Sequence, residues 1–207
     1  MSFHTAQELA GLGLAACGDD VRISTKASIH NAKNIRIGSH VRIDDFCVLS
    51  AGPGGIVIGS FIHVGVFSSL IGAGKITLQD FCNLSSRTSI YSSNDDYSGV
   101  RMTNPTIPPE FSGVTHAPVI IGRHAIIGAG SVLLPGVILE EGVAVGALSL
   151  IKQNCQAFGI YAGSPARRIG NRKRDLLELE GLFLRQMAPA RREKVDRGTR
   201  ATLKTPP

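Results

Sequence analysis

The sequence lacks the features of secreted, membrane-spanning or aromatic-cored proteins. It contains no tryptophan, and aromatic residues make up only 5% of its 207 residues, which argues against a large aromatic core. The N-terminus has no basic segment followed by an apolar stretch, as a secretory signal would. The apolar run over residues 125–139 is too short for a membrane span and contains Pro135. These absences predict a cytoplasmic protein that does not contact the membrane.

The four cysteines show no metal-binding spacing. Cys17, Cys47, Cys82 and Cys155 are widely separated and form no CxxC pair, which fits a reducing compartment. The histidine spacing also offers no set of three ligands that could meet around a metal. We therefore expect no metal cofactor.

The net charge of +6 is concentrated at one end of the chain. Residues 188–207 hold six basic and two acidic side chains, which leaves residues 1–187 at only +2. A terminus rich in Pro, Thr and Arg cannot bury enough apolar surface to order itself. We predict a disordered basic tail over 188–207 and no nucleic-acid partner.

An aliphatic residue returns every six positions along most of the chain. The series runs through Ile23, Ile29, Ile37, Ile43, Leu49, Ile58, Val64, Leu70, Leu78, Leu84, Ile90, Ile121, Ile127, Leu133, Leu139, Val145 and Ile151. About a quarter of the chain is Ile, Leu or Val, so an unbroken series of six has a chance of roughly one in four thousand. Small or β-branched residues fill the fifth place of each unit, and three of the four cysteines fall there.

A six-residue unit of this kind is a short strand followed by a turn, and three units close one triangular coil. Coils stacked at about 4.8 Å form a parallel β-solenoid, predicted here over residues 21–173. Residues 1–20 form an N-terminal cap in which Thr5 and Glu8 make a capping box, opening a helix through Leu14. A Leu-rich C-terminal helix is predicted over 174–187.

The repeat, with "IIGAGSVLLPGV" followed by "IYAGSPARRI", resembles the hexapeptide-repeat acyltransferases over about residues 21–174. The resemblance implies a left-handed parallel β-helix and a homotrimer with active sites between neighbouring subunits. With the loop motif "SSNDDYSG" added, the sequence is most similar to nucleotide-sugar N-acetyltransferases of O-antigen and capsule pathways, in particular those acting on dTDP-4-amino-4,6-dideoxyglucose. That similarity implies direct transfer of acetyl from acetyl-CoA to a sugar amine.

The repeat stops after Ile90 and resumes at Ile121, so residues 92–118 form a long insertion. Insertions project from a solenoid and commonly form its binding face. In O-acetyltransferase relatives the corresponding loop opens with a histidine base, and the resemblance places Asp95 at that position, between Asn94 and Asp96. A sugar hydroxyl has a very high pKa and needs a general base whose own pKa is close to neutral pH. A sugar amine loses its proton more readily and needs only a group that accepts it. The carboxylate therefore favours an amine acceptor.

Several other polar residues are candidates for the acceptor site. His63 occupies the sixth, outward place of its unit and is either a catalytic contact or a surface histidine. His116 closes the insertion and is a reserve base or a substrate contact. Asp44 and Asp45 either bind substrate or hold a turn.

The second half of the repeat is uninterrupted and offers backbone amides to the pantetheine of acetyl-CoA. The candidates are Gly128, Ala129, Gly146 and Ala147 for pantetheine, Lys152, Arg167 and Arg168 for the phosphates, and, from the resemblance, Pro165 beside adenine. Two alternatives stay open: an O-acetyltransferase of a saccharide or other hydroxyl acceptor, and a noncatalytic scaffold. A γ-type carbonic anhydrase shares the β-helix, but the histidine spacing does not offer the three metal ligands that it needs.

Overall fold

The computed structural model describes residues 1–187. The chain divides into two units, Met1–Lys173 and the segment beginning at Arg174. The predicted disordered tail, 188–207, lies outside the described residues and stays a prediction.

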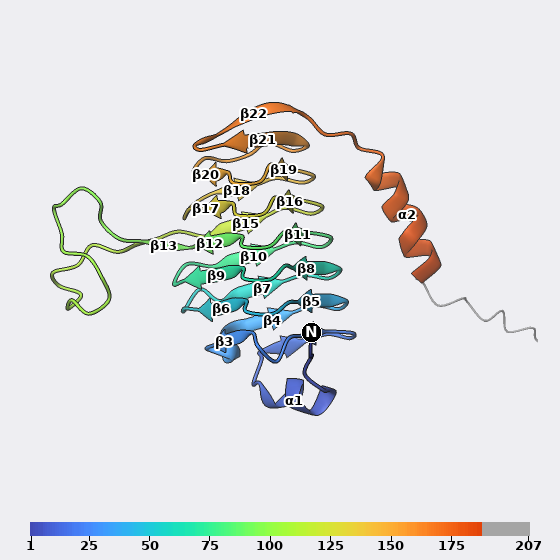
Figure 1. Ribbon diagram of the computed structural model, residues 1–207, viewed down its shortest axis with the longest axis horizontal. Helices are drawn as coiled ribbons and strands as arrows, with labels where there is room; N and C mark the ends of the chain where they lie inside the picture. The colour runs from blue at the N-terminus through green and yellow to red at the C-terminus, as the bar shows by residue number, and fades with distance from the viewer. Residues whose placement is uncertain (188–207) are drawn as a thin grey trace, which may run out of the picture. The chain divides into compact units, whose positions relative to one another are not determined.

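The first unit is a parallel β-solenoid with three sheets, as the repeat predicts (Figure 1). The first sheet contains β1 (Ala16–Cys17), β4 (Ile35–Ile37), β7 (Ile56–Ile58), β10 (Ile76–Leu78), β15 (Val119–Ile121) and β18 (Ile138–Leu139). The second contains β2 (Arg22–Ile23), β5 (Val41–Ile43), β8 (Ile62–Val64), β11 (Asn83–Leu84), β16 (Ile126–Ile127), β19 (Ala144–Val145), β21 (Gly159–Gly163) and β22 (Ala166–Asn171). The third contains β3 (Ser28–His30), β6 (Val48–Ala51), β9 (Ser69–Gly72), β12 (Ser89–Tyr91), β17 (Val132–Leu133) and β20 (Leu150–Ile151).

The repeat positions form the core. Every aliphatic residue of the six-residue series is buried except Ile29, which is partly buried. The fifth-place residues from Val41 to Cys155 are buried as well, Ser68, Thr88, Ser131 and Ser149 among them. Their hydroxyls donate to backbone carbonyls; that of Thr88, for example, donates to Ser85 O at 2.8 Å. Inward polar groups are thus hydrogen-bonded within the turns.

The solenoid is closed differently at its two ends. Helix α1 (Ala6–Gly11) has the predicted capping box, in which Thr5 N donates to Glu8 Oε2 at 2.7 Å. It ends at Gly11 and not at Leu14, because Gly13 takes a left-handed conformation with φ of 73°. Strand pairing begins at β1, five residues earlier than predicted. At the other end, β22 runs antiparallel to β21.

The second unit contains helix α2 (Leu176–Met187), which begins two residues later than predicted. Within residues 1–187, no helix is both long and apolar enough to cross a membrane.

We name the edges of the solenoid by the sheets that their turns connect. Between Ile23 and Ile151, the departures from six-residue spacing all lie on the 3–1 edge, between the third and first sheets: they fall at the 3₁₀ turn Ala32–Asn34, residues 52–55, residues 73–75 and the insertion 92–118. At the root of the insertion, β13 (Ser93–Asn94) pairs antiparallel with β14 (Thr115–His116). Beyond this ladder the loop projects away from the coils (Figure 1).

Candidate functional site

The 2–3 edge is a column of four-residue turns joined by a backbone ladder. The amide N–H of the third residue of each turn donates to the carbonyl oxygen of the second residue of the turn one coil earlier. Phe67 N donates to Asp45 O at 3.1 Å, and the same bond joins Arg87 to Val66, Gly130 to Ser86 and Leu148 to Ala129. The ladder fixes the spacing of successive turns along this edge.

The second residues of these turns leave their own amides unused. Within residues 1–187, the N–H groups of Asp45, Val66, Ser86, Ala129 and Ala147 have no hydrogen-bond acceptor. The contrast is the 1–2 edge, where side chains of the next coil accept from the corresponding amides: Ser39 Oγ accepts from Asp19 N, Ser60 Oγ from Ser39 N and Asp80 Oδ1 from Ser60 N. The 2–3 edge therefore presents a row of backbone donors, one per coil, to a ligand with regularly spaced acceptors.

Two predicted cofactor-binding glycines allow close stacking on this edge. Gly128 and Gly146 begin the turns that carry Ala129 and Ala147. A Cβ at Gly128 would collide with the amide of Ala147, and one at Gly146 would lie 3.1 Å from the Cβ of Ala162. Ala129 and Ala147 themselves are exposed. The structure thus brings all four predicted pantetheine contacts to one edge.

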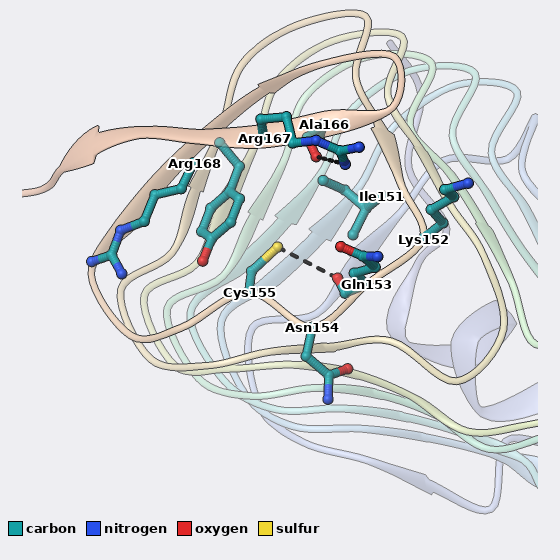
Figure 2. Close-up of a pocket in the computed structure, with 9 residues that line it drawn as sticks. Ile151, Lys152, Gln153, Asn154, Cys155, Ala166, Arg167 and Arg168 are labelled. Atoms are coloured by element: carbon teal, nitrogen blue, oxygen red, sulfur yellow. Dashed lines mark hydrogen bonds between the residues drawn. The ribbon is translucent and has the colours of Figure 1, made fainter.

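A small pocket at the C-terminal end of the solenoid gathers the three predicted phosphate-binding cations. Lys152, Arg167 and Arg168 line a cavity of about 80 Å³ (Figure 2). Arg168 is fixed, because its guanidinium donates to Gln156 Oε1 at 2.7 Å and to Asn171 Oδ1 at 2.6 Å. Arg167 donates only to the adjacent Ala166 carbonyl, at 3.3 Å. Arg167 is therefore the more available of the two guanidinium groups, and the exposed Pro165 lies in the turn just before it.

A network on the second sheet holds His63. Its Nε2 lies 2.8 Å from Asp44 Oδ2, and its Nδ1 lies 3.1 Å from Asn83 Oδ1. Arg42 Nε donates to the other oxygen of Asp44 at 2.7 Å, and Asp44 is buried. Both ring nitrogens of His63 are engaged, so the ring is positioned, with 43% of its side chain exposed.

Asp45 contacts the turn of the preceding coil. It accepts a short hydrogen bond from the Ser24 hydroxyl and lies 3.6 Å from Lys26 Nζ. The Ser24 hydrogen bond is the main cause that lowers the pKa of the Asp45 carboxyl. These contacts tie Asp45 to the turn that contains Ser24 and Lys26, and Asp44 to side chains of β5 and β8. The substrate-binding role of the two aspartates stays a prediction.

The loop root separates the roles of its two aspartates. Asp96 accepts from Ser98 N, Ser98 Oγ and Arg101 N, at 2.9, 2.7 and 2.9 Å, and these bonds lower its pKa to about 2. Asp95 is exposed and is the first residue beyond the β13–β14 ladder. It makes no hydrogen bond or ion pair with any residue between 1 and 187. Asp96 therefore shapes the turn, while the carboxylate of Asp95 is available.

The remaining loop candidates are held by the same ladder. Asn94 accepts from Thr115 Oγ1 through its backbone carbonyl, at 3.3 Å. His116 Nδ1 lies 2.8 Å from Ser93 Oγ, which itself accepts from Ala73 N. In the tautomer in which the Ser93 hydroxyl donates to Nδ1, Nε2 of His116 carries the hydrogen and can donate it to a ligand. That arrangement suits a substrate contact better than a base.

The sequence reasoning missed an exposed aromatic pair on the 2–3 edge. Phe46 and Phe67 stack with ring centroids 5.0 Å apart, with Lys26 over one ring and Arg87 over the other. All four occupy the third place of successive turns. A search at the coil period of about 20 residues, and not only at six, would have found them.

One chain does not bring all the candidates together. His63 and the row of free amides belong to the second sheet and the 2–3 edge, whereas Asp95 belongs to the 3–1 edge. No hydrogen bond or ion pair joins the two groups within the described part of the chain. These two edges are separated by the third sheet.

Known proteins resemble the chain closely, although no family model matches it. The chain is 51% identical to a dTDP-4-amino-4,6-dideoxy-D-glucose acyltransferase of Escherichia coli over 183 residues, which cover 88% of this chain and 95% of that protein. The chain belongs to the hexapeptide-repeat acyltransferase family. The fold of the present chain also matches that of AntD, an N-acyltransferase from Bacillus cereus.

Two AntD structures show which ligands that protein binds. One is in complex with dTDP and 3-hydroxybutyryl-CoA; it has a TM-score of 0.87 and 45% identity, over 90% of this chain and 98% of AntD. A variant of AntD in complex with dTDP-4-amino-4,6-dideoxyglucose and coenzyme A has a TM-score of 0.87 and 44% identity, over the same shares.

The cysteines of the acyltransferase are poorly suited to forming a covalent acyl intermediate. Burial raises the pKa of Cys47 to about 11, of Cys82 to about 12 and of Cys155 to about 11, and it also raises that of Cys17. The thiolate is the nucleophilic form, so the three buried thiols, those of Cys47, Cys82 and Cys155, are unreactive near neutral pH. In residues 1–187, no three His, Cys, Asp or Glu side chains are grouped as a metal site would require.

Proposed function

We propose that the protein transfers the acetyl group of acetyl-CoA to the amine of dTDP-4-amino-4,6-dideoxyglucose or a closely similar nucleotide amino sugar. The row of free amides on the 2–3 edge carries the proposal, because it offers a binding edge for an extended thioester donor. The named activity of the 51% identical relative and the ligands bound by AntD support the choice of substrates.

The donor fits the 2–3 edge and the pocket at the C-terminal end of the solenoid. The amides of Ala129 and Ala147 are placed to donate to the pantetheine carbonyls. Lys152, Arg167 and Arg168 supply positive charge for the phosphates, and Pro165 would flank the adenine. Acetyl-CoA supplies the activated acyl group, and these residues orient it along the edge.

The loop supplies the acceptor for the proton. Asp95 orients the sugar amine and takes its proton as the amine attacks the thioester carbonyl directly. The amide C–N bond forms, the thioester C–S bond breaks, and coenzyme A leaves as its thiol after its sulfur takes up a proton. Asp96 and Asn94 hold the backbone on either side of it, and His116 donates to the sugar. The Asp44–His63 pair, which lies on the second sheet, contacts the substrate from the side opposite the loop.

The active site requires two copies of the chain, because its two walls lie on different edges of one solenoid. We propose a homotrimer in which the loop of one subunit reaches the 2–3 edge of its neighbour. The reaction takes place in the cytoplasm, where acetyl-CoA and nucleotide sugars are available.

The decisive test is an acceptor comparison. The protein is mixed with acetyl-CoA and either dTDP-4-amino-4,6-dideoxyglucose or the matching sugar with a hydroxyl at C4, and thiol release and product mass are followed. We expect a single acetylation of the amino sugar and at least 10²-fold slower transfer to the hydroxyl. Faster transfer to the hydroxyl would make the protein an O-acetyltransferase, and no turnover of either acceptor would contradict the proposal.

A further inference from the structure

The 3–1 edge carries a basic hollow on the coils that precede the long loop. The hollow measures about 290 Å³, close to the lower end of the range for small-molecule sites, and it is lined by three cations, Lys33, Arg36 and Lys75, and by no acidic residue. Its other lining residues include Asn34, Gly54 and Gly55.

The turn glycines open this hollow. Ile35, Ile56 and Ile76 pair in register, so the residues before them, Asn34, Gly55 and Lys75, follow one another from coil to coil. Gly55 contributes no side chain between the other two, and its φ of 76° favours glycine. A Cβ there would lie 2.8 Å from the Asn34 carbonyl oxygen.

The turns around the hollow are fixed by hydrogen bonds. Asn34 Nδ2 donates to Gly52 O at 3.1 Å, and Gly54 N donates to Ala73 O at 2.9 Å. The cations therefore surround a cavity with defined walls.

The three cations differ from four other basic residues of the solenoid, which are paired with carboxylates. Arg22, Lys26, Arg42 and Arg123 each lie within 4 Å of a carboxylate, with partners Asp20, Asp45, Asp44 and Asp80. Lys33, Arg36 and Lys75 form no ion pair within residues 1–187. Three like charges around one cavity repel one another, and a bound polyanion removes that repulsion.

The hollow adjoins the root of the loop that carries Asp95. Ala73 N donates to Ser93 Oγ at 2.7 Å, and Val119 N donates to Lys75 O at 2.8 Å. A ligand that reaches from Lys75 toward Asp95 therefore follows one continuous edge of one subunit.

We propose that this hollow binds the diphosphate of the nucleotide sugar, an inference that rests on the proposed function. The diphosphate is the only multiply charged part of that substrate, and it lies between the nucleoside and the sugar. Binding it here places the sugar toward the loop root and Asp95. The row of amides on the 2–3 edge is then left to the acyl donor.

The test is dTDP affinity measured by calorimetry at fixed ionic strength, with Arg36→Gln, Lys75→Gln and the double variant. Each single change should weaken dTDP binding by about tenfold, the scale of one charge-assisted hydrogen bond. Thymidine, which has no phosphate, should bind all variants equally, and the KM for acetyl-CoA should not change. Arg22→Gln is the matched control, because Arg22 is an exposed cation of the second sheet that is already paired with Asp20.

A folded double variant with wild-type affinity for dTDP would overturn the proposal while leaving the transferase function intact. A wild-type protein that acetylates no nucleotide amino sugar would instead overturn the proposed function. In that case inorganic pyrophosphate replaces dTDP, with coenzyme A present to occupy the other basic pocket. Loss of pyrophosphate binding in the double variant would still support a diphosphate site, and unchanged or absent binding would rule it out.

Discussion

At the scale of single residues, Asp95 and Asp96 differ because of the hydrogen bonds made by only one of them. Asp96 uses both carboxylate oxygens within its own turn, and its pKa of about 2 keeps it ionised and occupied. Asp95 lies one residue earlier and points to no partner within 1–187. Sequence position could place both in the loop, but only the folded turn shows which carboxylate is available.

We therefore expect Asp95→Asn to lower kcat by about 10² to 10⁴, the usual scale for loss of a general base. The amide keeps the shape of the side chain but cannot take the proton, so KM for acetyl-CoA should stay unchanged. Asp96→Asn should cost less in kcat, since it weakens a turn without touching the reacting atoms. Steady-state kinetics across pH measure both; wild-type rates in Asp95→Asn beside a collapse in His63→Asn would assign the base to His63.

The two arginines of the C-terminal pocket also differ in how many side chains hold their guanidinium groups. Arg168 is held by Gln156 and Asn171, whereas Arg167 has only a neighbouring carbonyl. We expect Arg167→Ala to weaken acetyl-CoA more than dephospho-CoA, because the free guanidinium is placed to pair with the 3′-phosphate. Competition binding with both ligands tests this. Equal losses for the two would place Arg167 away from that phosphate.

At the scale of elements, the six-residue repeat predicts the coils well, because inward burial is the constraint that sets it. The aliphatic register from Ile37 to Ile151 is buried without exception. Helix ends are predicted less well: α1 stops at Gly11, where local backbone conformation decides the end and not the hydrophobic pattern. The repeat also gives no information on which edge amides are free, since that depends on side chains one coil away.

The 1–2 edge carries a second feature that the six-residue period does not reveal, a column of stacked rings. His40, Phe61, Phe81 and His124 stack in order, with centroids 4.7 to 4.9 Å apart. Both histidines are partly exposed. Burial and then the nearby Arg123 lower the pKa of His124 from its ordinary 6.5.

This column predicts how acid affects stability. The unfolded chain takes up a proton at His124 more readily than the folded one, so stability is lost as pH falls through about 6.5. In His124→Phe, which keeps a ring beside Phe81, the loss in unfolding midpoint between pH 7.5 and 5.5 should be smaller than in the wild type. Urea unfolding at both pH values measures the difference. Parallel pH profiles for the two proteins would show that His124 does not contribute.

At the scale of the whole molecule, the sequence identifies the two parts of the candidate site, the loop with Asp95 and the turns with the donor amides. It does not show that they lie on different edges of the solenoid. Asp95 and Ala129 can each be located from the repeat and the resemblance. Their assignment to different edges follows from how the coils close, because residues 92–118 leave at the 3–1 edge and the donor amides lie on the 2–3 edge. We therefore propose that the site draws on two chains.

Mixed assembly of two inactive variants tests this directly. Asp95→Asn disables the loop, and Ala129→Asp places a carboxylate among the exposed amides of the 2–3 edge and should block the donor. If each site combines the loop of one subunit with the edge of another, equal amounts of the two variants, unfolded and reassembled together, should regain about a quarter of wild-type activity. That fraction follows because about one site in four then receives both intact walls.

Each variant reassembled alone should stay inactive, and sedimentation at micromolar concentration should show three chains per particle. A site contained within one chain predicts no recovery at any mixing ratio, since every chain would carry one defect. Recovery near a quarter therefore separates a shared site from a trimer whose subunits work independently, which the oligomeric state alone cannot do.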